Sequence, residues 1–226
     1  MGGLGAKAQD ARRHEGAKAR KCEITGAEIH LLSLDAFASS CLDAFAPNFA
    51  LSRLDTLAEF QKIRTDKRKL EFLAVRVALK KMLGEEVYVS YTDEGKPFLA
   101  EKQMNISISH SKKWVAVGVH PDAQIGVDIE CWSDKIPKLY KRFLNEEEQE
   151  YLSDDTKKLH IAWSAKEALY KIIGKTAVDF ANQLQIFPFD ATESRRIFFA
   201  EHLVSGKLFK LHYSYNEDFV LVWCVD

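Results

Sequence analysis

The sequence predicts an α+β fold made of two similar halves related by a pseudo-twofold axis, each a long helix packed on an antiparallel sheet. Apolar residues recur at helical spacing over residues 66–83, just before Gly84, and a second long helical stretch covers about 156–173, just before Gly174. Segments with the alternation of strands follow each helix. Helices and strands that are segregated in this way along the chain are typical of α+β proteins.

The composition restricts the class of protein. The chain has 226 residues, 46% hydrophobic and 29% charged, which excludes wholesale disorder, collagen and coiled coil. The longest apolar run, residues 219–225, is far shorter than the roughly 20 residues that span a bilayer. The 4 cysteines show no zinc-binding spacing, and no signal peptide is recognisable. We therefore expect reduced thiols, a cytoplasmic location and no membrane partner.

The net charge of −1 is unevenly distributed. Residues 1–22 hold six basic and two acidic residues, so the remainder has 26 basic and 31 acidic residues. An acidic body lacks the broad positive field that nucleic-acid binding requires. The expected organisation is a flexible basic arm (1–22), an N-terminal half (23–122) and a C-terminal half carrying the metal site (123–226).

Shorter elements complete the expected fold. Alternation of apolar and polar residues predicts that the three successive strands 104–109, 114–119 and 125–130 form a meander. Asn145, with Glu148 three residues later, has the pattern of a helix capping box. The expected strands cover residues 28–34, 86–91, 104–109, 114–119, 125–130, 183–189, 196–202, 207–213 and 219–225.

One strand places two carboxylates together. In residues 125–130 the apolar side chains take one face, so Gly126, Asp128 and Glu130 share the other. Neighbouring acids beside an apolar stripe repel each other unless a cation lies between them, and a hard divalent ion such as Mg²⁺ suits oxygen ligands. A solvated strand edge of alternating polarity is the alternative reading.

The second long helix carries Trp163, Glu167 and Lys171 along one face at four-residue steps. An exposed ion pair between Glu167 and Lys171 would explain the spacing without any function. Alternatively, Glu167 is a third carboxylate that completes a magnesium site with Asp128 and Glu130, and Lys171 balances the charge of a phosphate.

The two segments together resemble a known family. GVDIE at 126–130 and WSAKEALYK at 163–171 are similar, in this order, to the two signatures of the 4'-phosphopantetheinyl transferases, with 37 residues from Glu130 to Glu167. SISHS at 107–111, EGKPFL at 94–99 and RFLNEEE at 142–148 resemble further family segments. With 226 residues, the chain is similar in length to the two-half, monomeric members that activate surfactin synthetase, whereas the holo-acyl-carrier-protein synthase type is shorter.

The resemblance implies roles for individual residues. Asp128, Glu130 and Glu167 would bind Mg²⁺ together with the pyrophosphate of coenzyme A. Glu167 would also be the base for the acceptor serine, and Lys171 would neutralise or protonate the departing phosphate. The residues that would contact coenzyme A are Lys96, His110, Arg76, Arg68 and Lys166, with His110 at the 3'-phosphate. Glu148 matches an acidic position of the family near the metal, but the capping box explains it equally well.

The implied reaction transfers 4'-phosphopantetheine from coenzyme A to a serine of an apo acyl or peptidyl carrier protein, leaving adenosine 3',5'-bisphosphate. The implied fold is that of the family, the metal is Mg²⁺, and the partners are a carrier protein and coenzyme A. Two alternatives are a magnesium-dependent phosphohydrolase, which three carboxylates could equally support, and a non-catalytic module that binds carrier protein or coenzyme A. No motif indicates which carrier is modified.

Overall fold

The computed structural model describes residues 20–24, 26–35, 54–174 and 178–226. Most of the expected N-terminal arm lies outside these ranges. Residues 20–24, however, form strand β1 (Arg20–Ile24), which pairs antiparallel with β2 (Ala27–Ser33). Residues 20–22 of the expected arm thus belong to a sheet, while the division of the chain into an arm and two halves stays a prediction.

The described part of the chain alternates between strands and helices. Its other strands are β3 (Val89–Tyr91), β4 (Pro97–Leu99), β5 (Asn105–Ser111), β6 (Trp114–His120), β7 (Ile125–Cys131), β8 (Leu184–Ile186), β9 (Arg195–His202), β10 (Lys207–Tyr215) and β11 (Phe219–Val225). Its helices are α3 (Leu54–Lys62), α4 (Asp66–Leu83), α5 (Lys135–Leu139), the 3-10 turn η1 (Tyr140–Arg142), α6 (Glu146–Leu152), α7 (Thr156–Ile173) and α8 (Phe180–Gln183).

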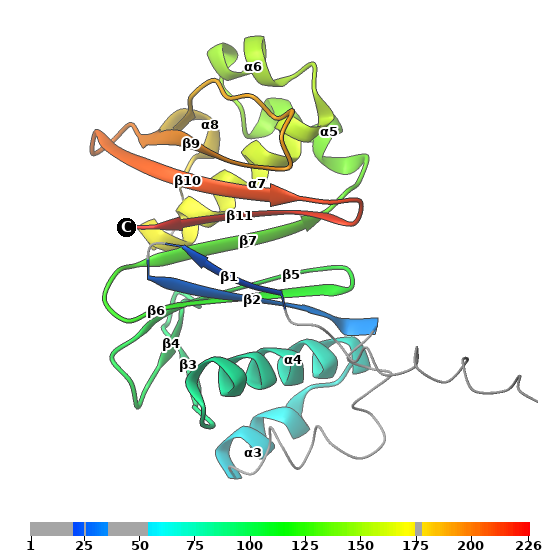
Figure 1. Cartoon of the computed structure of the whole chain (residues 1–226), viewed down its shortest axis with the longest axis vertical. Helices are drawn as coiled ribbons and strands as arrows, with labels where there is room; N and C mark the ends of the chain where they lie inside the picture. Colours follow the sequence, from blue (N-terminus) through cyan, green and yellow to red (C-terminus); the bar gives the residue numbers. More distant parts are fainter. Residues whose placement is uncertain (1–19, 25, 36–53, 175–177) are drawn as a thin grey trace, which may run out of the picture.

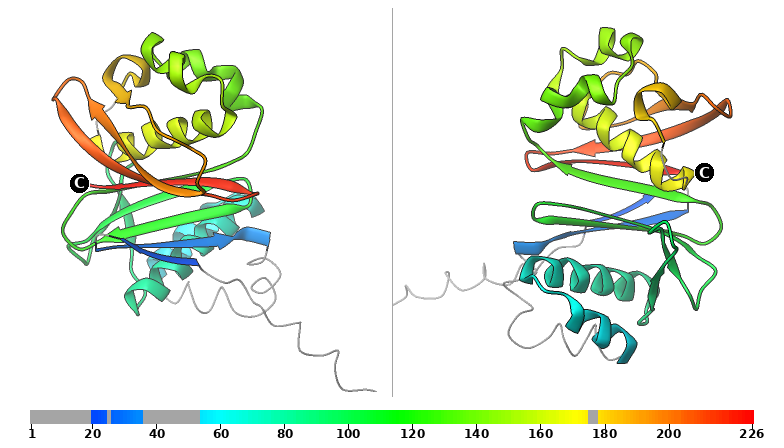
Figure 2. Two further views of the ribbon diagram at one scale, coloured as in Figure 1. Left: turned by 45° about the horizontal axis from the view of Figure 1, so that its top comes forward. Right: turned by 180° about the vertical axis from the view of Figure 1, so that it is seen from behind.

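Two antiparallel sheets lie face to face, with one long helix on the outer face of each (Figures 1 and 2). The first sheet has the order β1-β2-β6-β5 and is covered by α4, while the second has the order β7-β11-β10-β9-β8 and is covered by α7. A separate ribbon pairs β3 with β4. The layers confirm a mixed helix and sheet fold with antiparallel strands, and the pseudo-twofold relation between halves stays a prediction.

Three apolar clusters hold these layers together. One lies between α4 and the first sheet, and another surrounds α7 on the second sheet. The third fills the space between the sheets, and its members from β7 and β11 include Ile125, Val127, Ile129, Leu221 and Trp223. Burial of these side chains is the main favourable term that fixes one sheet against the other.

Both long helices begin and end as the sequence predicts. The Thr65 side chain accepts a hydrogen bond at the start of α4, and Asp155 does the same for α7. Each helix stops at a glycine in the left-handed region, Gly84 with φ 78° and Gly174 with φ 64°. The capping box of Asn145 and Glu148 at the start of α6 is also confirmed.

The expected three-stranded meander is wrong. β5 and β6 form the predicted antiparallel hairpin, but β7 pairs with β11 of the other sheet. Both edges of β6 are already occupied, by β2 and β5, so β6 has no free edge for β7. β7 instead crosses to the second sheet and turns Ile125, Val127 and Ile129 toward the first.

Helix α7 approaches β7 closely at Gly126. A Cβ atom at this position would lie 2.0 Å from the backbone oxygen of Ala168. Only glycine permits this separation, because real side chains cannot enter van der Waals distance of a backbone atom so closely. The contact sets the distance between the strand and helix that carry the predicted site.

Among the residues that the structure describes, no helix combines the length and apolar character needed to cross a bilayer.

We predict that Gly126→Ala destabilises the protein by about 3 kcal/mol or more, because the new methyl group forces α7 away from β7. Gly84→Ala is the matched control: a Cβ there meets nothing within 4 Å, so only the left-handed backbone is penalised, by about 1 kcal/mol. Urea unfolding of both variants measures the difference. Equal losses would show that the α7–β7 contact can relax.

Candidate active site

The two carboxylates of β7 face α7, as the alternation of the strand predicts. Asp128 Oδ1 lies 2.9 Å from the ammonium of Lys171, and Glu130 Oε1 accepts a hydrogen bond of 3.3 Å from the indole nitrogen of Trp163. Both partners belong to the predicted face of α7. The structure therefore brings the two sequence motifs together on one side of the second sheet.

Lys171 contacts β7 rather than Glu167. Its ammonium donates to Asp128 Oδ1 and, at 2.7 Å, to the backbone oxygen of Val127. The spacing of Glu167 and Lys171 alone predicted an exposed ion pair between them, but the ion pair of Lys171 is made with buried Asp128. Two of the three ammonium hydrogens are used in these contacts, so one is left for a ligand.

Serine hydroxyls of β5 hold the same carboxylates from the other side. Ser109 donates to Asp128 Oδ1 at 2.8 Å, and Ser111 donates to Glu130 Oε2 at 2.9 Å. Neither residue was assigned a role from the sequence. Alternation places the serines of β5 on one face of the strand, but the same pattern is typical of a solvated face and does not reveal what the serines contact.

The carboxylates sit in an environment that disfavours their negative charge. Burial raises the pKa of Glu167 to about 7, with a further contribution from the charge of Asp128 and opposition from Lys171. Burial and the neighbouring Asp128 also raise the pKa of Glu130. Asp128 Oδ2 is buried and has no hydrogen-bond partner among the described residues. Lys171 thus offsets only part of the negative charge.

A divalent cation fits this set of donors in charge and chemistry. Carboxylate oxygens are the ligands that Mg²⁺ prefers, and Asp128 Oδ2 is a buried oxygen that no described residue contacts through a hydrogen bond. Within the described ranges, however, no three Asp, Glu, His or Cys side chains converge closely enough to hold one ion. Shared binding by Asp128, Glu130 and Glu167 therefore requires their side chains to move.

A cavity of about 230 Å³ opens beside these groups. Glu167, Tyr170 and Lys171 of α7 line one side of it, and Lys96 lines the other. The Lys96 ammonium donates to Gln124 Oε1 at 2.7 Å, and burial lowers its pKa. The cavity therefore has two cationic side chains and one carboxyl group of raised pKa in its wall. No role for Tyr170 or Gln124 was predicted from the sequence.

An adjoining cavity of about 160 Å³ collects the other predicted basic residues, Arg68, Arg76 and His110. It shares Pro97 and Ile108 with the first, so the two are neighbours in one cleft. Their charges suit an anion such as a phosphate.

Contacts within this cavity fix its basic side chains. Arg68 Nη1 lies 2.9 Å from His110 Nε2 and 3.0 Å from a carboxylate oxygen of Glu71. The Arg76 guanidinium lies 3.4 Å from the centre of the Phe72 ring, and burial lowers its pKa. The Nε atom of Arg76 is buried and has no hydrogen-bond partner among the described residues.

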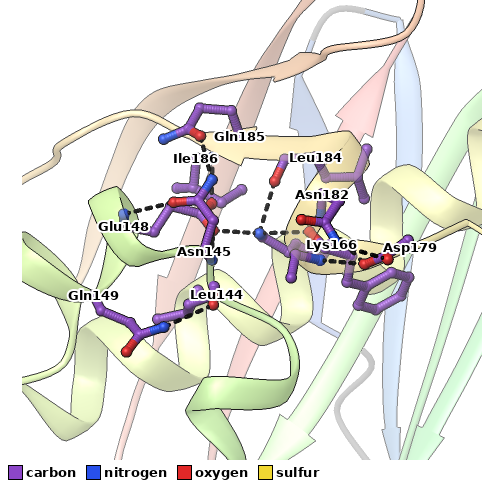
Figure 3. A network of polar contacts seen from close by, with 12 residues as sticks. Leu144, Asn145, Glu148, Gln149, Lys166, Asp179, Asn182, Leu184, Gln185 and Ile186 are labelled. Carbon is purple, nitrogen blue, oxygen red and sulfur yellow. Dashed lines mark hydrogen bonds and ion pairs between the residues drawn. The ribbon is translucent and has the colours of Figure 1, made fainter.

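Lys166 does not face this cleft, contrary to expectation. Its side chain is fully buried on the other side of α7, where the ammonium donates to Glu148 Oε2 (2.6 Å), Phe180 O (2.8 Å) and Leu184 O (2.7 Å) (Figure 3). All three ammonium hydrogens are used. Lys166 therefore links α7 to α6, α8 and β8 and has no hydrogen left for a phosphate.

The same network decides between the two readings of Glu148. Its carboxylate caps α6 at the Asn145 amide and also accepts from Lys166 and from the Ile186 amide (Figure 3). The side chain is fully buried. Glu148 is a helix cap and the partner of a buried lysine.

The segments that form this site are similar in sequence to known proteins. Residues 124–224 match the profile described as "ACPS: 4'-phosphopantetheinyl transferase superfamily". The match contains β7 and α7, and so includes Asp128, Glu130, Glu167 and Lys171. It supports the 4'-phosphopantetheinyl transferase superfamily.

Two curated relatives agree with this match. A Synechocystis sp. protein, provisionally named a 4'-phosphopantetheinyl transferase, is 28% identical over 152 residues, which cover 60% of this chain and 62% of that protein. The L-aminoadipate-semialdehyde dehydrogenase-phosphopantetheinyl transferase of Rattus norvegicus is 27% identical over 146 residues, covering 53% of this chain and 46% of that protein. The chain thus matches less than two thirds of either relative's length.

We predict that the metal-free protein loses stability as the pH rises from about 4.5 to about 7. Folding raises the pKa of Glu167 from 4.5 to about 7, so the folded state binds this proton more tightly than the unfolded chain. The resulting stabilisation is complete below the unfolded pKa and is lost as the pH passes through the folded value. Urea unfolding in the presence of EDTA measures it. Glu167→Gln should flatten the profile, and an unchanged profile would contradict the assignment.

We predict that Lys166→Met lowers the free energy of unfolding by about 3–5 kcal/mol, because it leaves the Glu148 carboxylate buried without its cation. Adding Glu148→Gln removes the second charge and should recover much of this loss. Lys157→Met, on the exposed side of the same helix, is the control and should change stability by about 0.5 kcal/mol or less. A loss of that small size for Lys166→Met would contradict the buried ion pair.

Proposed function

We propose that this protein is a 4'-phosphopantetheinyl transferase of the two-half, surfactin-synthetase-activating type. It would move the phosphopantetheine arm of coenzyme A to a serine of an apo acyl or peptidyl carrier protein. The observation that carries the proposal is a cavity lined by Glu167 and Lys171, which lies beside Asp128 and Glu130 and adjoins a second cavity lined by basic side chains. The names of the two relatives support the same reaction.

Coenzyme A carries negative charge at two separated places, its pyrophosphate and its 3'-phosphate. The cavity lined by Arg68, Arg76 and His110 suits the 3'-phosphate, because guanidinium groups bind phosphate oxygens through paired hydrogen bonds. The adjoining cavity, with Lys96 and Lys171 in its wall, suits the pyrophosphate. A single coenzyme A molecule would thus occupy both cavities of the cleft.

The carboxylates would hold the metal of the reaction. Asp128, Glu130 and Glu167 supply the oxygen ligands, and Mg²⁺ would offset charge on the pyrophosphate oxygens during transfer. In the metal-free protein the negative charge of Glu130 and Glu167 is disfavoured by burial and by Asp128. A bound cation would relieve that repulsion.

The chemical step exchanges one phosphorus–oxygen bond for another. The acceptor serine hydroxyl attacks the phosphorus attached to the pantetheine arm, and the bond from that phosphorus to the bridging oxygen breaks. Glu167 takes the hydroxyl proton as general base, since its side chain lines the cavity in which the substrate would lie. Adenosine 3',5'-bisphosphate leaves with the bonding electrons, and the third ammonium hydrogen of Lys171 is available to the departing phosphate.

All of these groups come from one chain, so we propose that the active protein is a monomer. A cytoplasmic location is consistent with Cys131 and Cys224, which are free thiols. The carrier protein itself is not specified by the cleft.

We predict that the protein, incubated with Mg²⁺, coenzyme A and an apo carrier protein, increases the mass of the carrier by one phosphopantetheine. EDTA should abolish this gain, and Asp128→Asn should reduce the rate at least about 100-fold, because the isosteric amide removes a charged ligand. Intact-protein mass spectrometry of several fatty-acid, polyketide and peptide-synthetase carriers provides the measurement.

The same assay tests the competing functions. Release of phosphate from coenzyme A without a gain in carrier mass would indicate a phosphohydrolase. Binding of carrier or coenzyme A with neither product would indicate a non-catalytic module. Either result, across the whole panel of carriers, would refute the transferase.

A further inference from the structure

Strands β5 and β7 are joined by serine side chains instead of by a backbone ladder. Among the strands that the structure describes, each of the two is the edge of its own sheet, and the one backbone partner of β7 is β11. The hydroxyls of Ser107, Ser109 and Ser111 accept hydrogen bonds from the amides of Val127 (2.9 Å), Ile129 (3.2 Å) and Cys131 (3.0 Å). A buried amide that is left without an acceptor destabilises the fold. The three serines thus satisfy the free edge of β7.

Two of these serines also contact a carboxylate. A serine hydroxyl has one hydrogen, and accepting from an amide leaves that hydrogen free to point elsewhere. Ser109 directs it to Asp128 and Ser111 directs it to Glu130. The residue in the equivalent position to Ser107 is Gly126, which has no side chain to receive a hydrogen bond.

These contacts determine which carboxylate oxygens are available. Oδ1 of Asp128 is occupied by both Ser109 and Lys171, whereas Oδ2 has no hydrogen-bond partner among the described residues. Asp128 is only 4% exposed, so its carboxylate has little freedom to rotate and interchange its two oxygens. At Glu130, Ser111 holds Oε2 while Trp163 donates to Oε1.

We propose that Ser109 and Ser111 are positioning residues that orient Asp128 and Glu130 for a divalent cation. This inference rests on the proposed function, since it concerns the metal of that site. Hydrogen bonds to carboxylate ligands fix their orientation, and loss of one typically weakens metal binding about 10–100-fold. Ser107 makes the same backbone contact but has no carboxylate to orient.

Binding of Mn²⁺ to the full chain without coenzyme A, measured by titration calorimetry, tests the inference without any turnover and without any contact between coenzyme A and Ser107, which lines the first cavity. Ser109→Ala and Ser111→Ala should weaken Mn²⁺ binding about 10-fold or more. Ser107→Ala is the matched control: it loses an equivalent amide contact, so its thermal stability should fall similarly while Mn²⁺ affinity stays within about 3-fold of the wild type. Ser111→Thr retains a hydroxyl at a half-buried position and should also stay within that range.

Equal Mn²⁺ affinity in all three alanine variants would overturn the inference and leave the serines a purely structural role. Failure of the wild type to bind Mn²⁺ would also overturn it. If Ser109→Ala does not fold, the comparison of Ser111→Ala with Ser111→Thr decides the matter. A wild type that binds Mn²⁺ but modifies no carrier refutes the proposed function alone, so the two failures are distinguishable.

Discussion

The close contact between α7 and β7 at Gly126 and Ala168 is the constraint on which the site depends. It brings the helix near enough for Lys171 to reach both Asp128 and the backbone of Val127. The other face of β7 is apolar and packs against the first sheet, so the strand is held from both sides. The carboxylates consequently project from a strand whose backbone has little freedom to shift, so the movement that shared metal binding requires is left to the side chains.

Buried charges lie on two sides of helix α7, and the two sides differ in how fully these charges are compensated. On one side, Lys166 and Glu148 are completely desolvated but fully hydrogen-bonded, and so their charges are compensated internally. On the other side, Asp128 Oδ2 has no hydrogen-bond partner among the described residues, and Glu167 has a pKa raised to about 7. A satisfied pair rigidifies a fold, whereas an under-compensated group invites a ligand. One side of α7 therefore stabilises the fold, and the other side faces the candidate active site.

Local sequence patterns were enough to predict the elements that carry the site. The ends of α4 and α7 and the capping box of α6 follow from side chains within a few residues of each terminus. The shared face of Asp128 and Glu130 follows from strand periodicity. The pairing of β7 with β11 did not follow, because it depends on which edges are already occupied by strands distant in sequence.

Helical geometry could have prevented one error. Consecutive residues of an α-helix are about 100° apart around the axis, so Lys166 cannot share the face of Trp163, Glu167 and Lys171. Ser109 and Ser111 were harder to recognise, since their partners lie on a strand that is not adjacent in either sheet.

The serine contact between β5 and β7 also constrains how this sequence can vary. The contact is in parallel register, with each hydroxyl meeting the amide 20 positions later. A slip of one residue would replace the serines with Ile106, Ile108 and His110, and a slip of two would pair a hydroxyl with the wrong carboxylate. Strand β6 lies between β5 and β7 in the sequence, so an insertion or deletion in β6 would have to preserve this alignment. Ser-x-Ser-x-Ser and the Gly-x-Asp-x-Glu that follows it by 19 positions therefore form one structural unit, in which a shift of one part requires a matching shift of the other.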